Sequence, residues 1–517
     1  MDRRNFLLGA VATALLPTKP SGAQPANQPN ILFIFSDDHA TQAISAYGGR
    51  LKDIAPTPNI DRIAREGALF QNSFCANSIC GPSRACILTG KHTHINGFED
   101  NNNSKFDGSQ MTFPKLLQKA GYQTAIIGKW HLVSDPTGFD HWEILPGQGS
   151  YYNPDFLQMD GTRKRFPGYC TSLVTEKALD WLKSGRDTNK PFMLMCQHKA
   201  PHRNWMPPPE HLDLFDDVTL PEPPTLFDDY ANRSKTLAEQ EMTIARHMTW
   251  ISDLKLDENP ETNPDSQGVN GELKRMNPEQ LARWNAAYRD ENKRFVEEFR
   301  AGKMSEKDIT RWKYQRYMKD YLRCVRGVDD SVGQLLEYLD NSGLADNTVV
   351  IYCSDQGFYL GEHGWYDKRW MFEESLKMPF VIRWKGAVQP GSRPDALIQN
   401  IDYAPTFLDM AGVKPPAEIQ GVSLTPVLQG KKPADWRSAI YYRYTGERTH
   451  AVAAHDGVRT DRYKLIYFWQ TGEWNLFDLE KDPQELRSVH ADPQYHKTRT
   501  EMENLYQKLR AQYKVKS

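Results

Sequence analysis

Short runs of consecutive apolar residues recur along the chain, and they are rich in β-branched and aromatic side chains. Apolarity that is continuous rather than alternating is typical of strands that are covered on both faces. Such runs occupy residues 31–35 (ILFIF), 124–127 (TAII), 192–196 (FMLMC), 349–353 (VVIYC) and 380–384 (FVIRW). We therefore expect a series of buried strands distributed over most of the chain.

Amphipathic helical patterns lie between these runs, and each of them ends in a glycine, which is a common helix stop. They cover residues 58–67, 113–121, 174–185 and 327–343. Alternation of strands and helices is typical of an α/β protein whose sheet is sandwiched by helices. The sequence therefore predicts a large, mostly parallel sheet with helices on both faces.

The pattern changes twice in the second half of the chain. Residues 215–325 are charged, contain several prolines and then become helical, so we interpret them as an insertion that packs over one edge of the sheet. A solvated helical decoration explains the same charged faces equally well. After Gly430, alternating segments and a helical stretch from about Tyr495 predict a small antiparallel sheet with one helix. We therefore predict a main domain over residues 27–430 and a C-terminal α+β subdomain over residues 431–517.

The N-terminal segment, residues 1–26, has the pattern of an export signal. Arg3 and Arg4 precede an apolar run at residues 6–16, and small residues follow it. This run is shorter than the roughly 18–20 apolar residues that a membrane-spanning helix needs. A twin-arginine signal peptide explains it, and we expect the remaining chain to be periplasmic or secreted. No later stretch is long and apolar enough to predict a membrane span.

Composition excludes some classes of partner. The 517 residues include 64 Lys and Arg against 66 Asp and Glu, which gives a formal net charge of -2. A protein that coats nucleic acid needs a strong excess of basic residues, so we expect no nucleic acid partner. The cysteines are odd in number and show no CxxC spacing, so at least one of them is unpaired. The sequence leaves a bridge between Cys75 and Cys86 open, and it does not indicate an oligomeric state.

Chemically reactive side chains follow four of the predicted strands directly. In an open parallel sheet, ligands bind outside the carboxyl ends of the strands, so these side chains are expected to share one edge of the sheet. A solvated turn explains any one of these strand ends, but it does not explain four together. The residues are Asp37, Asp38, His39, Lys129, His131, His198, Lys199, His202, Asp355 and Gln356.

Four oxygen-bearing side chains in this set predict a metal site. They are Asp37, Asp38, Asp355 and Gln356. Oxygen ligands without thiol or imidazole suit a hard cation such as Ca²⁺ or Mg²⁺. Neighbouring carboxylates repel each other unless a cation or a proton lies between them, and a metal explains such a pair. Taken alone, the pair Asp37-Asp38 has a helix cap or a turn as its simpler explanation.

The stretch SICGPSRACILTGKH, residues 78–92, places a cysteine in an unusual setting. Pro82 favours the first turn of a helix, which puts Cys80 at the helix N-terminus, where the dipole favours anions. Arg84 lies one turn further on and can reach back beside residue 80. An anionic group bound there would meet a metal, a helix dipole and a guanidinium together.

The motif CGPSR followed by TGK resembles the signature of the formylglycine-dependent sulfatases, which belong to the alkaline-phosphatase-like superfamily. The resemblance continues through PNILFIFSDDH, GYQTAIIGKWHL, HKAPH, SDQG and VRTDRYKLI, and so covers nearly the whole chain after the predicted signal. It implies that a formylglycine-generating enzyme oxidises Cys80 to formylglycine (3-oxoalanine), whose hydrate is a geminal diol. Cys80 would then also belong to the metal site, and residues 27–430 would form the catalytic sulfatase domain.

The resemblance further implies roles for six catalytic residues, which are Cys80, Arg84, Lys129, His131, His202 and Lys368. One hydroxyl of hydrated residue 80 attacks sulfur and displaces the alcohol. The second hydroxyl then collapses to the aldehyde and expels sulfate. Arg84 would stabilise the ionised diol, and His131 would help to deprotonate the second hydroxyl.

Other residues implied by the resemblance contact the sulfate or the leaving group. Lys129 and Lys368 would hold sulfate oxygens, although Lys377 lies close enough in the sequence to be an alternative to Lys368. His202 would protonate the leaving oxygen, which an unactivated sugar alkoxide needs. His198 is expected to bind substrate, either by sharing that role or by orienting the sulfate.

The overall pattern looks most like bacterial sulfatases that act on 6-sulfated amino sugars, such as N-acetylglucosamine 6-sulfate, in glycosaminoglycans or mucin-type glycans. The implied partner is a sulfated carbohydrate, and His455 is expected to contact a sugar hydroxyl, with a surface loop histidine as the alternative. Other specificities stay open: an arylsulfatase, an N-sulfoglucosamine or 2-sulfated uronate sulfatase, or a phosphonate or phosphodiester hydrolase of the same superfamily. An inactive glycan-binding relative is the alternative outside enzymes, and intact Cys80, Arg84 and Lys129 argue against it.

Overall fold

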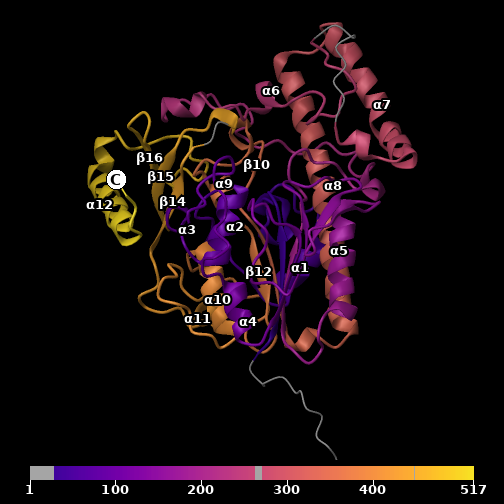
Figure 1. Cartoon of the computed structure of the whole chain (residues 1–517). Helices are drawn as coiled ribbons and strands as arrows, with labels where there is room; N and C mark the ends of the chain where they lie inside the picture. Colours follow the sequence, from indigo (N-terminus) through magenta and orange to yellow (C-terminus); the bar gives the residue numbers. More distant parts are fainter. Residues whose placement is uncertain (1–27, 262–270, 447–448, 517) are drawn as a thin grey trace, which may run out of the picture.

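A large mixed sheet forms the centre of the molecule, in a computed structural model that describes residues 28–261, 271–446 and 449–516 (Figure 1). Its strands follow the order β2-β12-β9-β1-β8-β4-β5-β6-β7. They span Ala68–Leu69 (β2), Phe380–Arg383 (β12), Thr348–Ser354 (β9), Asn30–Ser36 (β1), Phe192–Gln197 (β8), Gln123–Lys129 (β4), His141–Leu145 (β5), Asp155–Gln158 (β6) and Arg163–Arg165 (β7). The central strands β9, β1, β8, β4 and β5 are parallel, whereas β12 and β6 run against their neighbours. The predicted α/β fold class is confirmed, and the run at residues 380–384 forms an antiparallel strand.

Residues that alternate along a central strand enter two different hydrophobic cores, one on each face of the sheet. In β1, Leu32 and Ile34 belong to one core. Ile31, Phe33 and Phe35 belong to the other. All five side chains are buried, and this explains why the strand reads as a continuous apolar run in the sequence.

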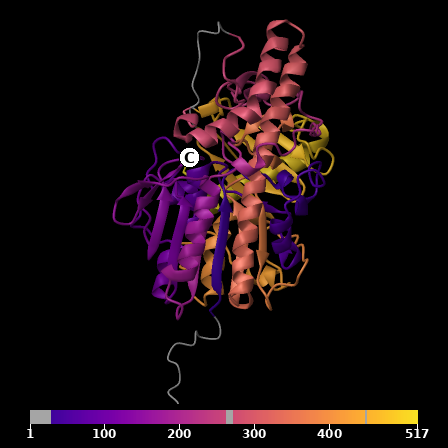
Figure 2. The ribbon, with the colours of Figure 1, turned by 90° about the vertical axis from the view of Figure 1, so that its right-hand side faces the viewer.

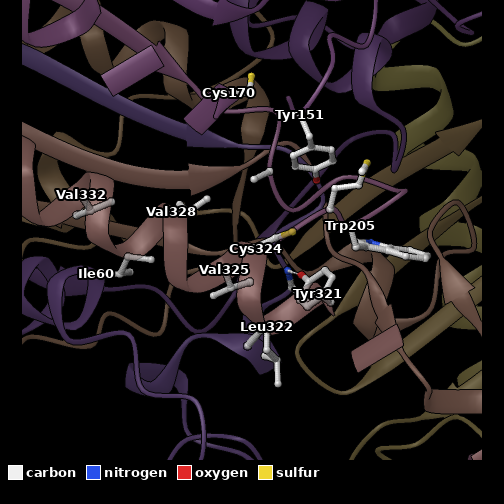
Figure 3. Close-up of a cluster of buried hydrophobic side chains, with 14 of the residues drawn as sticks. Ile60, Tyr151, Cys170, Trp205, Tyr321, Leu322, Cys324, Val325, Val328 and Val332 are labelled. Atoms are coloured by element: carbon white, nitrogen blue, oxygen red, sulfur yellow. Dashed lines mark hydrogen bonds between the residues drawn. The ribbon is translucent and has the colours of Figure 1, made fainter. Parts of the chain in front are cut away.

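Helices cover both faces of the sheet (Figures 1 and 2). One face carries α1 (Pro58–Arg65), α5 (Cys170–Asp180) and α8 (Glu306–Asn341), and the other carries α2 (Cys80–Thr89), α4 (Phe113–Lys119) and α10 (Tyr403–Met410). Figure 3 shows part of the first core, where Val325, Val328 and Val332 of α8 share a cluster with Ile60 of α1 and Cys170 of α5. The sheet is therefore sandwiched as predicted.

Helix α8 is much longer than the pattern over residues 327–343 predicts. It runs unbroken over 36 residues, and it joins the expected insertion directly to the face of the sheet. Gly327 lies inside this helix, where a Cβ would be only 3.2 Å from Cγ of Pro208. The expectation that a helix starts at Gly327 was wrong, because the helix begins at Glu306, where Ser305 and Asp308 form a capping box.

The expected insertion contains a helical hairpin that projects beyond the sheet (Figure 2). Its first arm is α7 (Pro278–Arg300), and its second arm is the N-terminal half of α8. Phe295 and Trp312 stack between the arms, with ring centroids 3.7 Å apart. The short helix α6 (Ile244–His247) accepts a hydrogen bond from the Tyr366 hydroxyl at 3.0 Å through its last carbonyl. Part of the insertion therefore packs against the main domain.

A smaller antiparallel sheet with one helix follows near the C-terminus, as predicted. It contains β14 (Ala439–Tyr444), β15 (His455–Thr460), β16 (Tyr463–Phe468) and β17 (Glu473–Asp478), in this order. Helix α12 (His496–Gln512) covers one face, where Tyr441 and Tyr506 share a cluster. Tyr442 and Phe468 on the opposite face join a core of the main sheet. The small sheet is therefore attached through an apolar interface.

Short elements connect these layers. They are β3 (Ser73–Phe74), β10 (Tyr359–Leu360), β11 (Tyr366–Asp367), β13 (Ile398–Gln399), α3 (Thr93–Asn96), α9 (Glu373–Leu376) and α11 (Thr425–Leu428). All seven cysteines are buried and unpaired, so Cys75 and Cys86 are not bridged. The predicted signal at residues 1–26 lies outside the described residues. Among the helices of the described ranges, none is both long and apolar enough to cross a membrane.

Candidate active site

Four strand ends meet at one edge of the main sheet, because β9, β1, β8 and β4 are parallel and adjacent. Asp37 and Asp38 follow β1, and Asp355 follows β9. Asp38 turns the chain with a φ of 63°, and its N–H donates to Asp355 Oδ1 at 3.1 Å. The three carboxylates are fully buried, and each offers an oxygen within 4.8 Å of the others. The structure thus brings these predicted ligands together.

Helix α2 brings Cys80 to the same edge. Cys80 is the first residue of the helix, as the position of Pro82 predicts, and its Sγ lies 3.5 Å from Asp37 Oδ1. Ser83 fixes the helix to the end of β9 by donating its hydroxyl hydrogen to the carbonyl oxygen of Asp355. Burial and the neighbouring Asp37 raise the pKa of the Cys80 thiol to about 12. An unmodified thiol at this position would therefore be a poor nucleophile.

Arg84 is the central cation of the site. Its Nη2 lies 3.1 Å from Asp37 Oδ2 and 3.1 Å from Asp355 Oδ2. Its Nη1 donates to the carbonyl oxygen of Lys129 at 2.6 Å and to Gln197 Oε1 at 2.9 Å. The guanidinium therefore connects α2 to the ends of four strands, whereas the sequence predicted only a position beside residue 80.

Lys129, the last residue of β4, supplies a second cation. Its ammonium is fully buried and forms an ion pair with Asp37. It also donates to the side-chain oxygen of Gln148, an exposed residue in the segment after β5. Burial raises the pKa of Asp37, but Lys129, His202 and Arg84 together outweigh burial and hold this pKa well below its usual range. Asp37 is thus charged and well compensated.

Lys368 reaches the site from the segment after β11. Its Nζ lies 2.5 Å from Asp38 Oδ1 and 3.3 Å from Cys80 Sγ. Lys377, the alternative in the sequence, pairs instead with Glu373 at 3.1 Å, and its side chain is 32% exposed. The structure therefore brings Lys368, and not Lys377, next to residue 80.

The other two carboxylates lack sufficient positive charge. Burial raises the pKa of Asp38 to about 7, because its partner Lys368 does not offset burial and the repulsion from Asp37. Burial and the charge of Asp37 also raise the pKa of Asp355. Asp38 Oδ2 and Gln356 Oε1 are buried without a hydrogen-bond partner among the described residues. Unpartnered oxygens beside three carboxylates fit a divalent cation that prefers oxygen ligands.

Two histidines of the predicted set lie close to these charges. His202 Nε2 is 3.8 Å from Asp38 Oδ2, while its Nδ1 donates to the carbonyl oxygen of Arg203 at 2.6 Å. His131 has a φ of 56°, and its Nδ1 is buried without a hydrogen-bond partner in the described part of the chain. Burial, reinforced by the charge of Lys129, lowers the pKa of both imidazoles well below their usual value. Burial therefore disfavours the charged form of both rings.

The two predicted substrate-binding histidines lie elsewhere. His198 faces α8, where its Nε2 is 3.0 Å from Ser331 Oγ. His455 is fully buried, and its Nε2 accepts a hydrogen bond from the N–H of Met371 at 3.2 Å. Its Nδ1 donates to the carbonyl oxygen of Ala453 at 2.8 Å, so both ring nitrogens are engaged within the protein. The expected sugar contact of His455 is corrected to a packing role among aromatic rings, and His198 is turned away from the carboxylates.

Sequence reasoning missed a polar network beside Lys368. Asp367 and Arg369 flank this lysine with φ values of 78° and 93°, and their side chains form an ion pair. Asp367 Oδ2 also lies 3.3 Å from His450 Nε2, which is 3.2 Å from Arg203 Nη1. The network therefore extends from Lys368 to the segment after β8. The stretch YDKR, in which opposite charges flank a lysine, is the signal that could have indicated it.

Comparisons with known proteins agree with this geometry. A family model described as Sulfatase matches residues 29–413, and one described as N-sulphoglucosamine sulphohydrolase, C-terminal, matches residues 361–512. An N-acetylglucosamine-6-O-sulfatase of Bacteroides thetaiotaomicron is 48% identical, over 98% of this chain and 91% of its own length. The human N-acetylglucosamine-6-sulfatase is 26% identical, over 91% of this chain and 81% of its own length.

Solved structures share the fold. One of them, a protein in complex with its substrate D-glucosamine-2-N,6-O-disulfate, has a TM-score of 0.89 at 49% identity and covers 94% of this chain and 98% of that chain. A phosphonate monoester hydrolase from Silicibacter pomeroyi has a TM-score of 0.71 at 21% identity and covers 94% of this chain and 96% of that chain. At this lower identity the similarity shows the fold alone.

Proposed function

The chain belongs to the sulfatase family, and from this premise we propose that it removes the 6-O-sulfate of N-acetylglucosamine or glucosamine in glycosaminoglycans or mucin-type glycans. The observation that carries the proposal is the position of Cys80 Sγ, 3.5 Å from Asp37 Oδ1 and 3.3 Å from Lys368 Nζ, among buried cations. The two relatives named as 6-sulfatases, at 48% and 26% identity, support the position of the sulfate on the sugar.

A divalent cation is part of this proposal. The residues that would hold it are Asp37, Asp38, Asp355 and Gln356, together with residue 80. Asp38 Oδ2 and Gln356 Oε1 support this set, since neither oxygen accepts a hydrogen bond among the described residues and both are available to coordinate a cation. Both Ca²⁺ and Mg²⁺ prefer oxygen ligands and fit this set. We propose Ca²⁺, with Mg²⁺ as the alternative. When bound, the ion supplies positive charge that stabilises the sulfo oxygens in the transition state.

Residue 80 is proposed to act as formylglycine, also called 3-oxoalanine, which a formylglycine-generating enzyme would form from Cys80. Its hydrate would supply one hydroxyl that bonds to sulfur while the bond from sulfur to the sugar oxygen breaks, and a second hydroxyl that would expel sulfate as the aldehyde returns. The raised pKa of the unmodified thiol supports a modified residue. Arg84 would stabilise the ionised diol from its place on Asp37 and Asp355.

The remaining catalytic residues hold the sulfo group and move protons. Lys129 and Lys368 would bind sulfo oxygens as point charges. His202, in its protonated form, would donate the Nε2 proton to the leaving sugar oxygen, because its Nδ1–H is held by a backbone carbonyl. Its pKa, lowered by burial, makes the protonated ring a strong acid. His131 would accept the proton of the second hydroxyl of residue 80, since its lowered pKa keeps the ring in the basic form.

Hydrolysis of N-sulfoglucosamine is a second candidate function. The match of residues 361–512 to the C-terminal part of N-sulphoglucosamine sulphohydrolases favours it. The structural neighbour at 49% identity has a substrate that carries an N-sulfate as well as a 6-O-sulfate. The 6-O-sulfate ranks first, because the relative at 48% identity is named for that position.

Export completes the proposal. A twin-arginine signal at residues 1–26 would carry the protein out of the cytoplasm, so that it meets sulfated glycans in the periplasm or outside the cell. Mass spectrometry of the mature N-terminus, after expression with the full signal, tests this assignment. A mature protein that still begins at Met1 would contradict it.

The substrate is tested with a panel of defined compounds and the mature, metal-loaded protein, by measuring released sulfate or phosphonate. N-acetylglucosamine 6-sulfate, N-sulfoglucosamine, a 2-sulfated uronate, an aryl sulfate and a phosphonate monoester separate the candidates. We expect the highest kcat/KM for the first compound. Faster turnover of N-sulfoglucosamine would favour the second candidate, and faster turnover of the phosphonate would contradict both. Mass spectrometry of the peptide that contains residue 80 measures its conversion to formylglycine.

A further inference from the structure

The segment after β5 covers the ammonium of Lys129. β5 pairs with β4 in register, so that its last residue, Leu145, lies beside Lys129. Three residues later, the side-chain oxygen of Gln148 accepts a hydrogen bond from Lys129 Nζ. Gln148 is exposed, whereas Lys129 is fully buried. A neutral amide therefore separates a catalytic cation from solvent.

The backbone around Gln148 is shaped to hold the amide there. Gly147 and Gly149 flank it with φ values of 56° and 69°, in the left-handed region that favours glycine. A Cβ at position 149 would lie 2.8 Å from Cδ1 of Leu145, so a larger residue would displace the segment. Tyr151 ends the segment, and its hydroxyl donates to the carbonyl oxygen of His202 at 2.5 Å. The segment is thus fixed at both ends to the active site.

The hydrogen-bonding capacity of Lys129 indicates what Gln148 does. An ammonium has three hydrogens and accepts none. Asp37 takes one of them and Gln148 takes another, and the described residues include no third partner of Nζ. Two fixed partners leave one N–H with a defined direction. An amide is suited to this task, because it orients the ammonium without neutralising it and without repelling an anionic substrate.

We propose that Gln148 is a positioning residue for Lys129, which aims the remaining N–H of the ammonium at an oxygen of the sulfo group. This inference rests on the proposed sulfatase function. It means that the affinity of the site for the sulfo group depends in part on a neutral residue. Gln148 acts through Lys129, so its effect concerns the sulfo oxygens and is the same for every sulfated sugar that the enzyme accepts.

The test uses the metal-loaded protein and three variants. Gln148→Glu places a carboxylate on Lys129, which competes with the sulfo group and repels it. Gln148→Ala removes the partner. Gln389→Glu is the matched control, because Gln389 is also an exposed glutamine, in the loop after β12. Since β12 runs against the central strands, this loop leaves the sheet at the edge opposite the active site.

Titration calorimetry with inorganic sulfate measures binding to the site without turnover. We expect Gln148→Glu to weaken sulfate binding by at least about 30-fold and Gln148→Ala by about tenfold, as for the loss of a charge-assisted hydrogen bond. Gln389→Glu should change the Kd by less than about twofold, and the Tm of the three variants should stay near that of the parent protein. The value of kcat/KM for the sulfated sugar should fall in parallel with the sulfate affinity.

A sulfate Kd for Gln148→Glu and Gln148→Ala within twofold of the parent value would overturn the inference. If Gln148→Glu does not fold, the Kd of Gln148→Ala decides alone. The proposed function fails separately, namely when the parent protein binds sulfate but hydrolyses no sulfated compound of the panel. In that case the change of Kd still decides the role of Gln148 toward Lys129.

Discussion

Two clusters of buried charges differ in how close their cations lie to the carboxylate oxygens. The active-site cluster comprises Asp37, Asp38, Arg84, Lys129, Asp355 and Lys368. The subdomain cluster joins α9 to the small sheet and comprises Glu373, Arg459, Lys464 and Glu485. Lys464 Nζ lies 2.9 Å from Glu373 Oε1 and 2.7 Å from Glu485 Oε1. Arg459 adds a further contact to Glu373 at 3.1 Å.

The comparison of one acid from each cluster shows the difference. Burial raises the pKa of Glu373, but Lys464 and Arg459 outweigh it and hold this pKa well below the usual range. Burial raises the pKa of Asp38 to about 7, and one of its oxygens has no hydrogen-bond partner in the part of the chain that the structure describes. Glu373 therefore finds its counter-charge within the chain, whereas Asp38 lacks part of it. Burial and Glu373 also raise the pKa of Glu485, but its Oε1 lies 2.7 Å from Lys464 Nζ, whereas the ring nitrogen of His202 is 3.8 Å from Asp38 Oδ2. A perturbed carboxylate without a close cation on one oxygen indicates a binding site.

The largest effect on activity is expected from Cys80→Ala, which removes the atom that becomes the nucleophile. We expect kcat to fall by more than about 10⁴-fold, as for the loss of other catalytic nucleophiles. Sulfate release measures this loss. Cys86→Ala is the matched control, because Cys86 is a buried cysteine of the same helix whose thiol meets Asn96 and not the carboxylates. A Cys80→Ala protein with a tenth of the parent activity would refute the proposed nucleophile.

Removal of the divalent cation should affect only the active-site cluster. Exhaustive chelation should lower kcat by about 10²-fold or more, because the sulfo oxygens lose their main counter-charge. It should also lower the free energy of unfolding, by about 2.7 kcal/mol if the ion had been present at 100 times its Kd. Calorimetry and sulfate release measure both effects, and separate addition of Ca²⁺ and Mg²⁺ identifies the ion. Unchanged activity after chelation would remove the metal from the mechanism.

Lys464→Met should affect the subdomain cluster in the opposite way. The variant leaves Glu373 and Glu485 buried with too little positive charge, which should cost about 3–5 kcal/mol of the free energy of unfolding. Urea denaturation measures this loss. We expect kcat/KM per folded molecule to change by less than about threefold, because Lys464 contacts no residue of the active-site cluster in the described contacts. A large loss of kcat without a loss of stability would erase the distinction between the two clusters.

The part of the site that the sequence predicts is the part fixed by sheet topology. Asp37, Asp38 and Asp355 follow buried strands and Lys129 ends one, and the carboxyl ends of adjacent parallel strands meet. The sequence pattern therefore indicated that these side chains lie close together, although it gave no distances between them. The antiparallel direction of β12 was not predictable in this way. A continuous apolar run shows that a strand is buried, but it does not show in which direction the strand runs relative to its neighbour.

The part that the sequence does not predict depends on side-chain direction and on neutral residues. Gln197, which bonds to Arg84, is followed directly by His198, which faces α8. Successive residues of a strand point to opposite faces of the sheet. His455 starts β15, and its pattern does not reveal that its ring enters an aromatic core. Gln148 carries no charge, so nothing in the sequence distinguishes it from other loop amides.

Of the predicted lysine, Lys368, and its alternative, Lys377, the variant Lys368→Ala should have the larger effect. Its ammonium lies 2.5 Å from Asp38 Oδ1 and 3.3 Å from Cys80 Sγ. We expect kcat/KM to fall by about 10²-fold, because an electrostatic contact to the reacting group is lost. Lys368→Arg should recover little of the activity, since a planar guanidinium does not fit the place of a compact ammonium. Steady-state kinetics measure both variants.

The smallest effect is expected from Lys377→Ala. This lysine pairs with Glu373 across one turn, but its side chain is 32% exposed, and such pairs contribute at most about 0.5 kcal/mol to the free energy of unfolding. Glu373 keeps Lys464 and Arg459 as partners, so its buried charge stays compensated when Lys377 is lost. Sulfate release and urea denaturation should both give values within twofold and within about 0.5 kcal/mol of the parent protein. If Lys377→Ala instead lost more activity than Lys368→Ala, the sulfo group would be bound from the side of the subdomain cluster, and that cluster would have to be counted as part of the active site.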